Sequence, residues 1–330
     1  MKYVPPPTGG DDTAIFAAAI ATLDPNGDVL VVPEYSYSPT TINLGAKRRV
    51  TILMRGARIY QRAGATQSLI KIGDGINYTP DCLLIGGLLD GNANALLPSS
   101  GICGIEALGT ENFRAKETRI TAFPQHAMRY LGNATRYSAY GGTDDCYLTS
   151  CGGSAVSVEG QAYTVKCRGG IMSGNGRYVY PDGHQDNIAA FHAYGSDTHE
   201  VDGVTFDENL IDVILQDCSN CNIRPGISEN VKRSNYMFLG GNGHTLTVGP
   251  IIGFSQELRL GYSAIVLSCQ GSVIGHGSMR PNPYQCKHAV EELSGAANNV
   301  IDFLALSGAG GGIYTIPNNG SIVGQNIRYY

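Results

Sequence analysis

Short segments recur along the chain in which apolar and polar residues alternate. Alternation with a period of two is typical of a β-strand that buries one face. The segments are GIEAL from Gly104, AMRYL from Ala127, AVSVE from Ala155, AFHAY from Ala190, VILQD from Val213, YMFLG from Tyr236, AIVLS from Ala264, AVEEL from Ala289 and GIYTI from Gly312. Their starts are 23, 28, 35, 23, 23, 28, 25 and 23 residues apart. This near-constant period predicts a solenoid in which each coil covers the next.

The second residue of each segment is expected to point into the solenoid, and the third and fifth residues to point to solvent. The predicted inward column is Ile105, Met128, Val156, Phe191, Ile214, Met237, Ile265, Val290 and Ile313. Strand candidates between the segments, VTILM from Val50, VDGVTF from Val201 and HTLTVG from His244, supply one or two further sheets. The predicted fold is therefore all-β, a right-handed parallel β-helix with coils of about 23–28 residues.

The first 27 residues are expected to form an arm and a short capping helix ahead of the solenoid, which occupies residues 28–330 as one domain. Asp11 and Asp12 can cap the helix, and Phe16, Ile20 and Leu23 share one of its faces. Such a helix would cover the open end of the first coil, which is otherwise an unpaired edge. The segment DVLVVP from Asp28 is the first predicted strand.

Composition supports this fold and limits the partners. The chain has 44 Gly, no Trp and only 15% charged residues, as expected for many short strands joined by tight turns. Its net charge is -5 and it has no extended run of Lys or Arg, which argues against nucleic acid as a partner. It has neither an apolar run long enough to cross a bilayer nor a secretory signal at its start. We therefore expect synthesis in the cytoplasm and no association with a membrane.

The nine cysteines are an odd number in a long chain, and we expect most of them to be reduced and buried. Cys218 and Cys221 form a lone C-x-x-C without a second pair at zinc spacing, and we interpret them as small apolar residues of the interior.

The opening of the chain resembles the pectate-lyase-like superfamily of parallel β-helices, which includes phage tailspike depolymerases and bacterial polysaccharide-degrading enzymes. The resemblance lies in GDDTAIFAAAIATL (10–23), VLVVPEYSYS (29–38) and GGLLDGN (86–92). It implies the fold more than the reaction, because this scaffold carries lyases, hydrolases, epimerases and adhesins. It also implies a phage or prophage tail component, and such proteins are often homotrimers.

The 35-residue step between Ala155 and Ala190 contains about ten residues more than the other steps, and these must leave the coil as a loop. That loop, GRYVYPDGHQDN (176–187), offers a cation, aromatic rings, carboxylates and an imidazole. Its candidate site residues are Arg177, Tyr178, Tyr180, Asp182, His184 and Asp186. The string GHQDNIAAF (183–191) is similar to a His-x-Asp-x-Ile-x-Phe element of the same superfamily; alternatively, His184 and Asp186 cap a turn.

Stacking of the coils is expected to bring distant residues together beside this loop. We predict that Ser157 and Leu215 flank His192, and that Glu159 and Asp217 flank Tyr194, with Arg129 and Glu106 further along. The predicted groove wall is Arg129, Glu159, His192, Tyr194 and Asp217.

Two reactions fit this wall. In a hydrolase, Asp186 with Glu159 or Asp217 would be acid and base. In a lyase, His184, His192 or Tyr194 would remove the proton beside a uronate carboxylate that Arg129 or Arg177 neutralises. The alternative to an enzyme is an adhesin or structural spike that binds glycan without cleaving it. No cofactor is expected; the resemblance makes calcium conceivable, but no dense carboxylate cluster supports it.

GGTDDCYL (141–148) resembles the Asp-Asp-Cys element of polygalacturonases, but the other elements of that family do not follow in order. We interpret Asp144 and Asp145 as turn residues. His199, Asp202 and Asp207 are expected around a corner of the coil, away from the groove, and His244, His276 and His288 are isolated.

Overall fold

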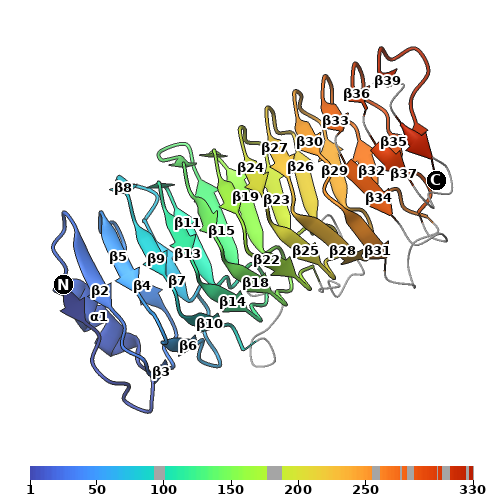
Figure 1. Ribbon diagram of the computed structural model, residues 1–330. Coiled ribbons are helices and arrows are strands. Elements are labelled where there is room, and N and C mark those ends of the chain that lie inside the picture. The colour runs from blue at the N-terminus through green and yellow to red at the C-terminus, as the bar shows by residue number, and fades with distance from the viewer. Residues whose placement is uncertain are drawn as a thin grey trace.

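The computed structural model describes residues 1–92, 101–176, 188–254, 261–275, 277–280, 286–302, 304–306, 313–324 and 327–329. Within these ranges the chain winds as a right-handed parallel β-helix, and Figure 1 shows the coils stacked from the N-terminal to the C-terminal end. Every strand pairing in the described part of the chain is parallel. The predicted fold class is confirmed.

Three long sheets run along the helix, and we name them A, B and C. Sheet A contains β1 (Lys2–Tyr3), β2 (Asp28–Val31), β5 (Val50–Leu53), β9 (Leu83–Ile85), β13 (Arg114–Lys116), β17 (Gly142–Asp144), β21 (Lys166–Arg168), β24 (Glu200–Asp202), β27 (Asn222–Arg224), β30 (Thr245–Thr247), β33 (Val273–Gly275), β36 (Val300–Ile301) and β39 (Ile322–Val323). Sheet B contains β3 (Ser36–Tyr37), β6 (Arg58–Tyr60), β10 (Leu88–Asp90), β14 (Arg119–Thr121), β18 (Tyr147–Thr149), β22 (Ile171–Ser173), β25 (Thr205–Asp207), β28 (Ile227–Val231), β31 (Ile251–Phe254), β34 (Gly277–Arg280), β37 (Leu304–Leu306) and β40 (Arg328–Tyr329).

Sheet C carries the segments found in the sequence. It contains β4 (Ile42–Asn43), β7 (Ile70–Ile72), β11 (Ile105–Leu108), β15 (Met128–Gly132), β19 (Val156–Gly160), β23 (Phe191–Tyr194), β26 (Val213–Gln216), β29 (Tyr236–Leu239), β32 (Ile265–Leu267), β35 (Val290–Glu292) and β38 (Ile313–Tyr314). A short sheet D, made of β8 (Thr79–Pro80), β12 (Thr110–Glu111), β16 (Ser138–Ala139) and β20 (Ala162–Tyr163), lies between sheets C and A in four consecutive coils.

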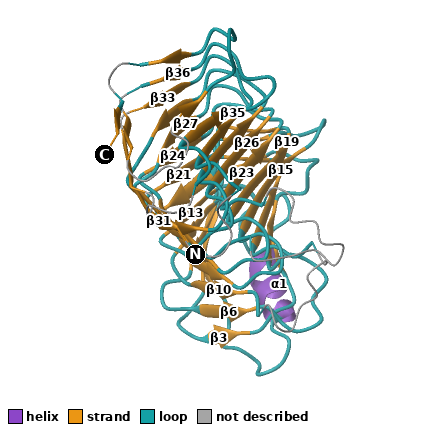
Figure 2. Ribbon diagram, turned by 90° about the vertical axis from the view of Figure 1, so that its right-hand side faces the viewer, coloured by secondary structure: helices purple, strands orange, loops and turns teal. Residues whose placement is uncertain are grey.

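Helix α1 (Thr13–Ala21) lies at the N-terminal end of the solenoid, as the sequence predicts (Figures 1 and 2). Phe16, Ile20 and Leu23 are buried, and the ring of Phe16 packs edge-on against Tyr37 of β3 with centroids 5.2 Å apart. The side chain of Asp12 makes no capping bond to the helix; it accepts hydrogen bonds from Thr8 and Ser38 instead. Asp12 therefore joins the arm to the first coil.

The interior is filled by inward side chains from sheets A, B and C. All nine cysteines are buried and none forms a disulfide, which agrees with the expectation from the sequence. The stretch from Val201 proved to be two strands, β24 and β25, because Gly203 has a positive φ of 66° and turns the chain from sheet A to sheet B.

The inward column was predicted correctly except in two coils. In β26 and β29 it is Val213 and Tyr236 that align with Phe191 and Ile265, not Ile214 and Met237. Three consecutive apolar residues in each strand hide the period of two, so the sequence does not distinguish the two faces there.

Ile214 and Met237 point outward and are nevertheless buried. Together with Val266 of β32 they belong to a small apolar cluster outside the main core. The other buried members of this cluster are Ala189, Leu210 and Ile211. The outer face of sheet C is thus polar in its middle coils and apolar further toward the C-terminus.

The structure contains no described helix that is both long and apolar enough to span a membrane.

Candidate functional site

A column of polar side chains follows the outer face of sheet C across four coils. The register pairs Glu106 with Arg129, Arg129 with Ser157, and Ser157 with His192. Neighbouring parallel strands are about 4.8 Å apart, so these side chains are direct neighbours although the first and last are far apart in sequence. The pairing of Ser157 with His192 is as predicted.

Glu159 and Arg129 form the centre of the site. Nη2 and Nε of Arg129 donate to Oε2 of Glu159 at 2.6 and 3.2 Å, and Ser157 Oγ donates to Oε1 at 2.7 Å. On its other side Arg129 approaches Glu106, with Nη1 3.8 Å from Oε2. Both carboxylates are therefore held by one guanidinium.

The pKa of Glu159 lies below its ordinary value. Burial by itself would raise it, but the hydrogen bonds from Arg129 and Ser157 and the positive charge of Arg129 outweigh that effect. Glu159 is therefore ionised at neutral pH. A carboxylate of this kind can accept a proton or orient a neighbour, but it is a poor proton donor.

His126 completes the site and was not identified from the sequence. Its Nδ1 accepts a hydrogen bond from the backbone N–H of Ser154 at 2.9 Å, and its Nε2 lies 3.7 Å from Oε1 of Glu159. Burial is the main cause that lowers the pKa of His126, to about 4, against the opposing attraction of Glu159. A neutral ring that accepts at Nδ1 carries its proton on Nε2, facing Glu159.

His192 is a second neutral imidazole beside Glu159. Burial lowers its pKa, and the charge of Glu159 only partly opposes this effect. Its Nε2 is buried and has no hydrogen-bond partner among the described residues. Nine other buried side-chain atoms of the described residues share this property, among them Nε2 of His244 and the hydroxyl of Tyr236, so it is the position of His192 beside Glu159 that distinguishes it.

Two sequence-based placements were wrong. Leu215 pairs with Ala193 and is in the core, so it does not flank His192. Tyr194 pairs with Gln216, while Asp217 is exposed in the turn after β26 with a positive φ of 53°. The cause is the one-residue shift in β26 described above, which moves Asp217 out of the groove wall.

Tyr194 ends β23 and is 49% exposed. The last paired residues of β19 and β23 are Val158 and Ala193, which places Glu159 and Tyr194 one residue further along at the same edge. The structure thus brings Arg129, Glu159, His192 and Tyr194 to one face. The loop candidates Arg177, Tyr178, Tyr180, Asp182, His184 and Asp186 lie outside the described residues.

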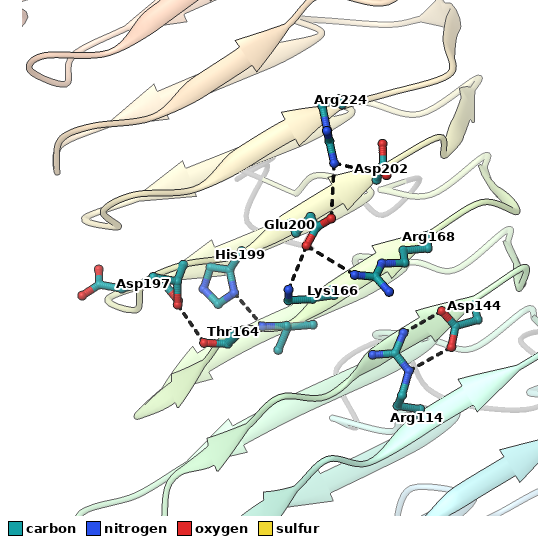
Figure 3. Close-up of polar contacts among 12 residues, drawn as sticks. Arg114, Asp144, Thr164, Lys166, Arg168, Asp197, His199, Glu200, Asp202 and Arg224 are labelled. Carbon is teal, nitrogen blue, oxygen red and sulfur yellow. Dashed lines mark hydrogen bonds and ion pairs between the residues drawn. The ribbon is translucent and has the colours of Figure 1, made fainter.

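A second charged group lies on the outer face of sheet A (Figure 3). Glu200 is 3.0 Å from Lys166 Nζ, 3.6 Å from Arg168 Nη2 and 3.4 Å from Arg224 Nη2. Arg224 also pairs with Asp202, which confirms that Asp202 lies away from the groove. These charges satisfy one another, so we interpret this group as a structural ion-pair network.

Asp144 is the last residue of β17 and lies on that same face of sheet A. Its carboxylate accepts two hydrogen bonds from Arg114, at 2.6 and 2.8 Å (Figure 3). Asp145 occupies the following turn with a φ of 51°. His199 is buried at the corner before β24, where its Nε2 pairs with Ser196 Oγ at 2.8 Å. None of these three residues faces the site on sheet C.

Within the described residues no group of three or more His, Cys, Asp and Glu side chains has the geometry to hold a metal ion. The prediction that no cofactor is required stays a prediction.

No family model matches this chain, and no curated protein matches it. Solved structures are similar in fold. The tailspike protein of E. coli bacteriophage HK620 in complex with pentasaccharide superposes with a TM-score of 0.74 at 11% identity, over 99% of this chain and 64% of the tailspike chain. A mutant of that tailspike gives a TM-score of 0.72 at 10% identity. The A-module of the Azotobacter vinelandii mannuronan C-5 epimerase AlgE4 superposes with a TM-score of 0.54 at 12% identity, over 96% of both chains.

These similarities support the parallel β-helix fold. The chain spans 64% of the length of the tailspike structure that it matches.

Proposed function

We propose that this protein binds a polysaccharide across the outer face of sheet C and acts on it by proton abstraction beside a uronate carboxylate. The observation that carries the proposal is the grouping of His192, Arg129 and Glu159 on one outer face, with Glu159 bonded to Arg129 and His192 kept neutral by burial. The tailspike neighbour holds a pentasaccharide, and the epimerase neighbour is named for mannuronan, so both handle chains of sugars. Because the sequence identity to both neighbours is low, we infer the reaction from the residues of this chain.

Each residue then has a definite role. His192, kept neutral by burial, is the proposed base for the C5 proton of the bound sugar. Arg129, positioned by Glu106 and Glu159, lies where it can stabilise the enolate charge that develops on the sugar carboxylate. Glu159 holds Arg129 and faces the proton of His126. In a lyase the C4–O bond then breaks, its electron pair leaves with oxygen, and water reprotonates that oxygen.

Hydrolysis by two carboxylates is less well supported on this face. It needs one carboxyl group with a raised pKa as the general acid. The pKa of Glu159 is lowered, and Asp217 is not beside it.

The proposal is tested with bacterial capsules and uronate polymers, including alginate and polygalacturonate. The reaction is run in deuterium oxide, and NMR follows deuterium entering at C5, while ultraviolet absorbance follows unsaturated ends and a reducing-end assay follows chain cleavage. His192→Ala and Arg129→Ala are expected to lower the rate by about 100-fold or more, because each removes a group that acts in the transition state.

Asp217→Asn serves as the matched control, because the sequence suggested this residue and the structure places it in an exposed turn. It is expected to keep the wild-type rate. New reducing ends with neither ultraviolet absorbance from unsaturated ends nor deuterium at C5 would show hydrolysis and overturn proton abstraction.

Binding without catalysis is the second candidate. It is favoured by the complete pairing of Arg129 with Glu106 and Glu159, which is also what a purely structural ion-pair network would show. If the polymers bind but are neither exchanged at C5 nor cleaved, the protein is an adhesin or structural spike. Assembly as a homotrimer, which the sequence resemblance implies, remains part of the proposal and is measured by sedimentation equilibrium.

A further inference from the structure

Four tyrosines gather over sheet D, outside the site on sheet C. Tyr137, which precedes β16, and Tyr163 of β20 have ring centroids 6.4 Å apart in an edge-on arrangement. Tyr78, which precedes β8, lies beside Glu111 in β12, and the interaction with this carboxylate raises the pKa of Tyr78. Tyr140 follows β16, and its backbone N–H donates to the carbonyl of Tyr163 at 3.2 Å. We call Tyr78, Tyr137, Tyr140 and Tyr163 the tyrosine strip.

The rings of the strip are available to a ligand. Tyr78 is 39% exposed, Tyr137 52% and Tyr140 56%, and Tyr163 is half-buried. Sheet D spans four coils, so the strip extends along the helix axis for about three coil spacings of 4.8 Å. Exposed tyrosines combine a flat apolar ring with a polar hydroxyl, which suits ligands that are apolar on one side and polar on the other.

Tyr140 occupies a position that disfavours a large side chain. It lies at the corner between sheets D and A with a φ of 56°, in the left-handed region. The same corner in neighbouring coils is occupied by Asp81, Asn112 and Thr164, all with positive φ. Asn and Asp tolerate this conformation, whereas a bulky residue there is strained. Because its side chain is 56% exposed, packing in the interior does not account for a tyrosine at this position.

The loops that carry two of the tyrosines are fixed against each other. Asn133 Nδ2 donates to Gly75 O at 3.2 Å, and Arg136 Nε donates to Ile76 O at 3.0 Å. Tyr78 and Tyr137 therefore lie on two loops that are hydrogen-bonded to each other. Pre-ordered aromatic side chains lose little entropy when a ligand binds.

The strip is also continuous with the site on sheet C. In the coil that contains Glu159, β19 ends at Gly160, and β20 with Tyr163 begins two residues later. One extended ligand can thus contact both surfaces.

We infer that the tyrosine strip is a glycan-binding subsite in which consecutive pyranose rings stack their C–H faces on the tyrosine rings and bond their hydroxyls to tyrosine hydroxyls and Glu111. This inference deepens the proposed function and rests on it, because it takes the occupant to be the polysaccharide processed on sheet C. Stacking depends on the shape of a sugar ring and not on its charge, so the strip accepts neutral as well as acidic pyranose chains.

The test is affinity electrophoresis of the wild-type protein and its variants through gels that contain dextran, galactomannan, alginate or bacterial capsule. Tyr137→Ala combined with Tyr163→Ala is expected to weaken retention by about tenfold or more in at least one gel, given the usual contribution of aromatic stacking. Tyr147→Ala is the matched control, since Tyr147 is 50% exposed but lies in β18 of sheet B. Phe at positions 137 and 163 is expected to restore most of the retention, because the ring remains.

Tyr140→Gly separates binding from folding. Glycine removes the left-handed strain, so the melting temperature is expected to rise while retention falls. A lower melting temperature with unchanged retention would show that Tyr140 is structural and would overturn its role in the strip.

Equal retention of the wild type and the double variant in every gel, or no retention of the wild type in any gel, overturns the subsite. A change in sedimentation mass of the double variant would instead assign the strip to contact between copies of the chain, which also overturns the inference. Deuterium entry at C5 or the formation of unsaturated ends reports the proposed function separately, since the strip variants retain His192, Arg129 and Glu159 and are expected to raise KM with little change in kcat.

Discussion

Gly142 lies in β17 at a point where two coils approach so closely that no side chain fits between them. A Cβ atom built there would be 1.8 Å from the carbonyl oxygen of Lys166, and the residue has a φ of 152°. The carbonyl of Gly142 accepts a hydrogen bond at 2.9 Å from the buried hydroxyl of Tyr130. This residue therefore fixes both the distance between coils and the position of an interior tyrosine.

Gly142→Ala is expected to destabilise the protein by about 3 kcal/mol or more, because the clash is with backbone that cannot move without breaking the ladder. Gly271→Ala is the control: Gly271 has a φ of 58° and nothing within 4 Å of its Cβ position, so only the left-handed penalty of about 1–2 kcal/mol applies. Urea unfolding of the two variants measures the difference. Equal losses in the free energy of unfolding would mean that the backbone at Lys166 moves to make room for the added methyl group.

At the scale of elements, β35 is joined to the following coil by one buried carboxylate. Glu292 is 1% exposed. It accepts hydrogen bonds from Asn299 Nδ2 at 2.9 Å, Ile316 N at 3.1 Å, Asn319 Nδ2 at 2.6 Å and Ser321 Oγ at 2.6 Å. Burial would raise the pKa of Glu292, but these bonds lower it below its ordinary value of 4.5. The carboxylate must therefore be ionised for the last coils to hold together.

The stabilisation by Glu292 is expected to be complete above its unfolded pKa near 4.5 and to be lost as the pH falls through its lower folded pKa. Glu292→Gln, which cannot accept all four bonds, is expected to speed amide hydrogen exchange in β38 and β39 at neutral pH by an amount that corresponds to about 1–3 kcal/mol. The difference from the wild type should vanish in acid.

The neighbouring Glu291→Gln is the control for this experiment, because Glu291 pairs with Lys287 on the outer face and does not reach β39. If both variants exchange alike, the bonds of Glu292 do not hold the last coils.

At the scale of the whole molecule, stability is the sum of coil-to-coil interfaces, and the ends are the places where an interface is missing. Helix α1 covers the N-terminal end (Figure 2), and its Phe16 packs on Tyr37. Along its length the solenoid presents one polar wall on sheet C, one ion-paired wall on sheet A and the tyrosine strip between them. The tyrosine strip is confined to the coils that contain sheet D.

Phe16→Asp is expected to uncover the first coil and to cause concentration-dependent association through its exposed strand edges and apolar residues. Light scattering after size-exclusion chromatography measures this effect. Ala18→Asp, a substitution on the exposed face of α1, is expected to leave the protein unassociated. Association of both variants, or of neither, would contradict a role of α1 as an end cap.

The sequence by itself determined the coil period, the capping helix, the burial of the cysteines and most of the inward column. These features depend on local alternation of apolar and polar residues, which each strand displays by itself. Local alternation was insufficient in β26, where Val213, Ile214 and Leu215 are all apolar, and Asp217 was misplaced for that reason.

Only the tertiary structure decided which side chains outside the aligned strand segments meet across coils. The corner segments between strands vary in length, so residues that lie tens of positions apart have no fixed spacing in the sequence, and a shift of one residue moves a side chain to the opposite face. The packing of successive coils therefore brought His126, which precedes its strand, to Glu159, and it assembled the tyrosine strip from three coils. Pairings of this kind depend on the stacked interior, which exists only after the chain has folded.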